Sequence, residues 1–116
     1  MEGKVRDLGE ASESIASIVR RIHLFNHLWK TFQERYGKKH VLANMLVQQK
    51  SDLQNSLIHL YPSKVSLAFD KEAGDNIVSI RLNQGVAKPG QDAAHIPLEQ
   101  LEHKFHKLVK GEMKGE

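Results

Sequence analysis

The residues best suited to chemistry in this sequence are its histidines. His23 and His27 are four residues apart, a spacing that on a helix places both imidazoles on one face, where they could supply two ligands to a metal ion. The residues between them lack the glutamate of a zinc-protease helix, and no third ligand can be assigned from the sequence. A solvated helix face is the favoured interpretation, so we expect no metal and no cofactor, and a metal site is the alternative.

A second group of histidines, His103 and His106, lies near Glu99 and Glu102. Carboxylates and imidazoles can act as general acids and bases, but they need a nucleophile or a bound substrate beside them, and no motif nearby supplies one. The sequence also has neither a nucleotide-binding glycine loop nor a Gly-x-Ser-x-Gly nucleophile elbow. We therefore expect that the protein is not an enzyme.

Basic residues are concentrated near the start of the chain. The formal net charge is +3, and residues 16–50 carry a larger positive surplus than the whole chain, with Glu34 as their one acid. On or just after the first expected helix, a basic face could contact an anion or the phosphates of nucleic acid through Arg20, Arg21, Lys30, Arg35, Lys38 and Lys39. An ordinary solvated face is the simpler interpretation, because no base-reading pattern accompanies these residues.

The first expected helix spans residues 8–36. Apolar or small residues recur along it with alternating spacings of three and four, which is typical of a narrow seam that packs against another helix. Such a helix would be roughly 40 Å long, more than a small compact domain easily covers. We therefore expect a homo-oligomer, with a dimer favoured, whose interface comprises Ile15, Ile18, Ile22, Phe25, Trp29 and Phe32.

Four further segments complete the prediction. A second helix over residues 39–60, ended by Pro62, forms an antiparallel hairpin with the first around Gly37, a continuous bent helix being the alternative. Polar residues 48–52 interrupt its apolar face and must meet solvent or pair across an interface. Period-two alternation predicts a β-hairpin over residues 65–82, followed by a loop over 83–95 that could hold a short strand near Val86, and by a C-terminal helix over 97–110.

These elements predict one α+β domain over residues 1–116 with the order α-α-β-β-α. The hydrophobic fraction of 40% is enough for a core, and without cysteine or a long apolar run we expect a cytoplasmic protein that is not in a membrane. The function that fits best is a small non-enzymatic interaction or regulatory protein. It would self-associate through its N-terminal helix and bind a macromolecular partner, presumed to be a protein, through the basic face or the loop; the alternative is a nucleic-acid-binding module.

Overall fold

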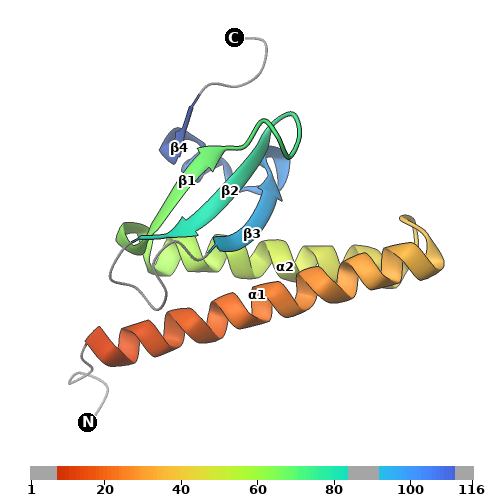
Figure 1. Ribbon diagram of the computed structural model, residues 1–116, viewed down its shortest axis with the longest axis horizontal. Helices are drawn as coiled ribbons and strands as arrows, with labels where there is room; N and C mark the ends of the chain where they lie inside the picture. The colour runs from red at the N-terminus through yellow and green to blue at the C-terminus, as the bar shows by residue number, and fades with distance from the viewer. Residues whose placement is uncertain (1–7, 84–91, 112–116) are drawn as a thin grey trace.

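Two long helices form an antiparallel hairpin that is the longest feature of the molecule (Figure 1). The computed structural model describes residues 8–83 and 92–111, with side chains from Ile15 onward. Helix α1 spans Leu8–Tyr36 and helix α2 spans Val41–Leu60. The two predicted helices and their hairpin arrangement are thus confirmed, and the continuous bent helix is excluded.

Local chemistry at the turn explains why the chain reverses there. Gly37 has a φ of +94°, a conformation that side chains with a Cβ rarely adopt, and its N–H donates to Gln33 O at 2.9 Å. His40 then caps the start of α2, because its Nδ1 accepts a hydrogen bond from Leu42 N at 3.1 Å. The stop signal predicted at Gly37 is confirmed.

A four-stranded sheet stands on the helix layer, with strand order β3-β2-β1-β4. Strands β1 (Val65–Phe69) and β2 (Ile77–Leu82) form the predicted antiparallel hairpin, whose register pairs Leu67 with Ile80. Strand β3 (Asp92–Pro97) adds to β2 antiparallel, and β4 (Val109–Lys110) adds to β1 in parallel. In Figure 1, β3 lies nearest to the helices, so this edge of the sheet is where helix and strand residues meet.

Strand β3 corrects the sequence prediction. Residues 92–95 were expected to belong to a loop, yet they pair with β2 as the first part of β3. The alternating large apolar residues that mark β1 and β2 are missing from Asp92–Pro97, and the strand is held instead by backbone pairing and by polar side chains from the helices. The short strand considered near Val86 lies outside the described residues.

The C-terminal segment is helical but not α-helical. The predicted helix over residues 97–110 consists of two 3-10 segments, η3 (Leu98–Gln100) and η4 (His103–Leu108), and ends in β4. The side chain of Asn55 explains the break, because its Oδ1 accepts from Glu102 N at 2.8 Å and its Nδ2 donates to Gln100 O at 3.0 Å. These are backbone groups that a continuous α-helix would have used internally.

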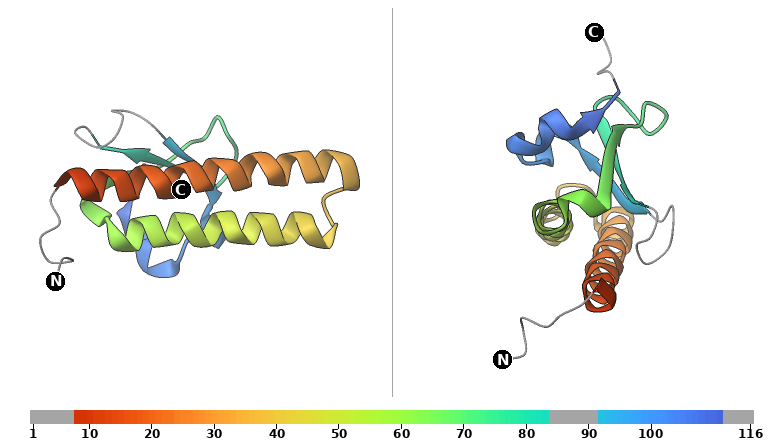
Figure 2. Two further views of the ribbon diagram at one scale, coloured as in Figure 1. Left: turned by 90° about the horizontal axis from the view of Figure 1, so that it is seen from below. Right: turned by 90° about the vertical axis from the view of Figure 1, so that its left-hand side faces the viewer.

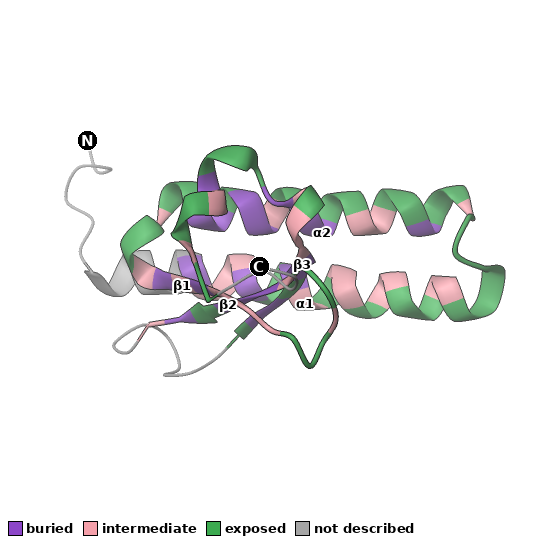
Figure 3. Ribbon diagram, turned by 90° about the horizontal axis from the view of Figure 1, so that it is seen from above, coloured by how far each residue is buried: buried purple, intermediate pink, exposed green. Residues whose placement is uncertain are grey.

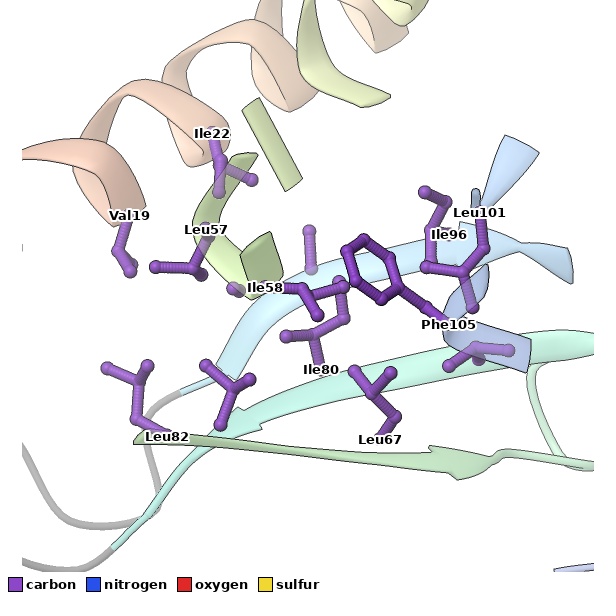
Figure 4. Packing of buried hydrophobic residues seen from close by; sticks show 14 of the residues in the cluster. Val19, Ile22, Leu57, Ile58, Leu67, Ile80, Leu82, Ile96, Leu101 and Phe105 are labelled. Atoms are coloured by element: carbon purple, nitrogen blue, oxygen red, sulfur yellow. The ribbon is translucent and has the colours of Figure 1, made fainter. Parts of the chain in front are cut away.

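A single hydrophobic cluster joins the helices, one face of the sheet and the 3-10 segments (Figure 3). In Figure 4, Val19 and Ile22 of α1 approach Leu57 of α2, while Phe105 lies between the helices and the strands. The inward side chains of β1 and β2 alternate as predicted. The cluster comprises Ile15, Val19, Ile22, Leu57, Ile58, Val65, Leu67, Val78, Ile80, Leu82, Ala93, Ala94, Ile96, Leu101 and Phe105.

We expect Asn55→Ala to lower the free energy of unfolding by about 2 kcal/mol, because the substitution leaves Gln100 O and Glu102 N without their buried partner. Urea unfolding followed by circular dichroism measures the change. Asn44→Ala is the matched control, since Asn44 is exposed on the same helix. Equal losses in both variants would contradict the role given to Asn55.

Candidate functional site

One side of the helix layer carries the sheet, and the opposite side is bare of any other element among residues 8–83 and 92–111 (Figure 2). The apolar residues on this bare side follow from helix geometry. Phe25, Leu28 and Phe32 lie roughly 60 to 120° around α1 from the core residue Ile22, all in the same direction. All three are half-buried and none belongs to the core cluster.

Helix α2 contributes a matching row of leucines. They repeat with spacings of four and seven residues and lie roughly 120 to 160° around the helix from Ile58, which packs into the core. Leu42 and Leu60 are exposed, at 42% and 58%, Leu46 is half-buried, and Leu53 is half-buried and also packs against the core cluster. We call the combined surface the outer face; it comprises Phe25, Leu28, Phe32, Leu42, Leu46, Leu53 and Leu60.

The residues predicted to form the oligomer interface are divided by the structure. Ile15 and Ile22 are 1% and 0% exposed, so the chain itself already covers them and they are not available to a second copy. Ile18 is partly buried against the same core. Phe25 and Phe32 belong to the outer face, while Trp29 lines a cavity on the other side of α1. The residues of the predicted seam therefore lie in three different environments: the core, the outer face and the cavity.

The predicted basic face is also divided. All six residues are exposed: Arg20, Arg21, Lys30, Arg35, Lys38 and Lys39. Arg21 and Lys30 are nine residues apart, which places them on opposite sides of α1. Arg21 flanks the outer face one turn before Phe25, whereas Lys30 lines the cavity. A single flat surface therefore cannot contact all six residues together.

The two histidines considered as metal ligands also separate. His23 Nε2 lies 2.9 Å from Asp92 O and 3.6 Å from Asp92 Oδ1, whereas His27 is exposed. No group of three or more metal-binding side chains occurs in the part of the chain that the structure describes.

Among residues 8–83 and 92–111, no helix is long and apolar enough to cross a bilayer.

A cavity of about 380 Å³ opens between α1, the middle of α2 and the β3 edge of the sheet. Its polar side chains come from elements far apart in the sequence, and its apolar wall comes from Trp29 and from residues of β2 and β3. The lining residues are His23, Asn26, Trp29, Lys30, Lys50, Ala73, Ile77, Asp92, Ala94, His95 and Pro97.

Lys50 is the most unusual of these residues, since its side chain is almost completely buried, at 4% exposure. Its ammonium donates to Asn26 Oδ1 and to His95 O, both at 3.3 Å, and lies 5.0 Å from the centre of the Trp29 ring. An ammonium has three N–H donors, and the described residues accept only two of them. Within the described part of the chain, one donor is thus left without an oxygen or nitrogen acceptor.

Lys50 also lacks a counter-ion. No carboxylate oxygen of residues 15–83 or 92–111, whose side chains the structure describes, lies within 4 Å of its ammonium. Burial, and secondarily the positive charge of Lys30, lowers the pKa of Lys50 from 10.5 to about 8. At neutral pH the side chain is therefore a buried cation that no carboxylate among the described side chains pairs.

The polar contacts around the cavity hold β3 in place. Gln54, which is fully buried, donates from Nε2 to Ala93 O and to His95 O at 3.0 and 3.1 Å. His95 Nε2 lies 2.9 Å from Asp70 Oδ2, and this hydrogen bond lowers the pKa of Asp70. The backbone itself is strained beside the cavity, because Ala94 has a φ of +66°.

Sequence reasoning missed most of this site. Lys50 lies in the polar stretch 48–52, for which pairing across an interface was one of the two alternatives; the pairing occurs between α2 and β3 of the same chain. The usable signal was a lysine at a position where the helical period of α2 calls for an apolar residue. Asn26 and the role of Trp29 carried no such signal.

Comparison with protein-family models, with curated proteins and with solved structures finds no match to this chain.

Proposed function

We propose that this protein is a small non-enzymatic interaction protein that self-associates through the outer face of its helical hairpin. The observation that carries the proposal is the row of apolar side chains along both helices on the side away from the sheet. Two such hairpins packed face to face would form a four-helix bundle with a sheet on each side, which buries both rows at once.

The size of the outer face suits a second copy. Helix α2 has 20 residues and is thus about 30 Å long; with two helices about 10 Å wide, each chain offers on the order of 600 Å². Two chains would bury about 1,200 Å², the lower end of the range for stable interfaces. Arg21 and Arg35 are charged residues beside this strip, and their long side chains can reach the rim.

Light-scattering mass across a concentration series tests this proposal. The wild-type protein should reach twice the mass of one chain at tens of micromolar, and Leu42→Glu/Leu60→Glu should stay monomeric. Both leucines are largely exposed, so each chain should keep its fold, as circular dichroism would show.

Val41→Glu/Leu108→Glu is the matched control, because it places the same two charges at exposed apolar residues outside the outer face. It should remain dimeric. A wild-type protein that stays monomeric, or a control that dissociates as readily as the test variant, would refute self-association through this face.

The binding of a macromolecular partner and a cytoplasmic location belong to the same proposal, and the lack of cysteine allows the latter. The nucleic-acid alternative stays a prediction. The same light-scattering series with a pool of short DNA and RNA separates the two: a salt-sensitive rise in mass would favour nucleic acid, and an unchanged mass would favour a protein partner.

A further inference from the structure

The cavity beside Lys50 has the properties of a ligand site. It is separate from the outer face, through which we propose that the protein self-associates. Lys50 is nearly buried, lacks a counter-ion within the described residues and keeps one N–H donor unsatisfied there. A buried charge is costly unless it is paired. An anion entering the cavity would supply both the missing charge and the missing acceptor.

The groups around Lys50 favour an anion over a cation. Lys30 and two histidines, His23 and His95, line the same cavity. Asp92 is the lining residue with a carboxylate, and that group already accepts a hydrogen bond from Ala94 N at 2.9 Å and faces His23. The positive charges at the cavity are thus those of Lys30 and Lys50, while His23 and His95 already have partners in Asp92 and Asp70.

The shape of the cavity indicates more than an inorganic ion. Its volume of about 380 Å³ lies in the range of small-molecule sites. Trp29, Ile77 and Pro97 supply an apolar wall. The ammonium of Lys50 lies over the Trp29 ring, 5.0 Å from its centre, so an apolar group can contact the part of the indole beside the ammonium while an oxygen atom reaches the ammonium itself.

We propose that this cavity binds a small organic anion, with a carboxylate or phosphate group on Lys50 and an apolar body against Trp29. Asn26 and the backbone carbonyl of His95 accept the other two hydrogen bonds of the lysine ammonium and hold it in position. Because the cavity and the outer face lie on different flanks of α1, binding and self-association can succeed or fail separately.

Trp29 is the single tryptophan of the chain, so its fluorescence reports on the cavity directly. We would titrate the wild-type protein with benzoate, phenyl phosphate, inorganic phosphate and the neutral isostere benzamide. Benzoate or phenyl phosphate should change the fluorescence with saturation, and the tighter of the two identifies the oxyanion. Inorganic phosphate should bind more weakly, and benzamide should bind least.

Lys50→Met should weaken binding roughly tenfold or more, the usual effect of losing a hydrogen bond to a charged group. Lys107→Met, which removes an exposed lysine of η4 outside the cavity, should bind as the wild type does. Circular dichroism checks that both variants fold. The proposal fails if neither anion gives a saturable change, if benzamide binds as well as benzoate, or if Lys50→Met binds as tightly as the wild type.

Discussion

Replacing Ile22 with alanine should lower the free energy of unfolding by about 3 kcal/mol. Ile22 is completely buried and meets Val19 and Leu57 where both helices reach the core (Figure 4). The smaller side chain leaves a cavity that the surrounding helices and strands can only partly fill. Urea unfolding at two protein concentrations measures the loss, which should be the same at both.

Phe32→Ala provides the contrast on the same helix. Phe32 lies on the outer face, half-buried beside the rings of Tyr36 and His40. If two chains pair there, truncating Phe32 should weaken the dimer, so its effect on stability should grow with protein concentration. A concentration-dependent loss for Ile22→Ala, or a loss below about 1 kcal/mol, would contradict the placement of Ile22 in the core of one chain.

Lys50→Met should stabilise the protein at neutral pH by about 2 kcal/mol. In the folded chain the pKa of Lys50 is about 8, below the 10.5 of an exposed lysine. Between these two values the unfolded chain binds more protons, so the stability of the wild type should rise as the pH rises through this window. Below it, the lysine is charged in both states and the cost of burial is present in full.

The groups facing Lys50 are Lys30 and His23 from α1 and Asp92 and His95 from β3, with Asp70 behind His95. All of these groups remain in Lys50→Met. Subtracting the two curves of unfolding free energy against pH therefore isolates the contribution of Lys50. Urea unfolding between about pH 7 and pH 10 gives both curves. Identical slopes in the wild type and the variant would show that Lys50 is not a buried cation. A residue retained against stability in this way is consistent with a role in binding.

Secondary structure with strong periodicity could be predicted from this sequence. The three-four spacing of α1, the turn at Gly37 and the period-two alternation of β1 and β2 each act locally, so one segment is enough to reveal them. The 3-10 geometry after Pro97 could not be predicted, because Asn55, more than forty residues earlier, takes up the backbone groups. An apolar spacing of three and four residues is compatible with both types of helix.

The candidate site could not be predicted from the sequence for a related reason. His23, Lys50 and His95 come from three elements, and nothing in their spacing says that they meet. Lys30 was grouped with the exposed bases of α1, since sequence periodicity gives a residue its side of the helix but not its neighbours there. Positions that break a pattern, such as Lys50 where the helical period of α2 calls for an apolar residue, are the ones that deserve a structural explanation.

Strand β3 forms one edge of the sheet, and edges are where sheets of different molecules join. Here the carbonyl oxygens of Asp92, Ala93 and His95 already face the side chains of His23, Lys50 and Gln54. A foreign strand would find these acceptors occupied, so the hairpin protects β3 against amyloid-like stacking. Any condition that separates α2 from β3 would remove that protection and leave these acceptors open to pairing with a strand of another molecule.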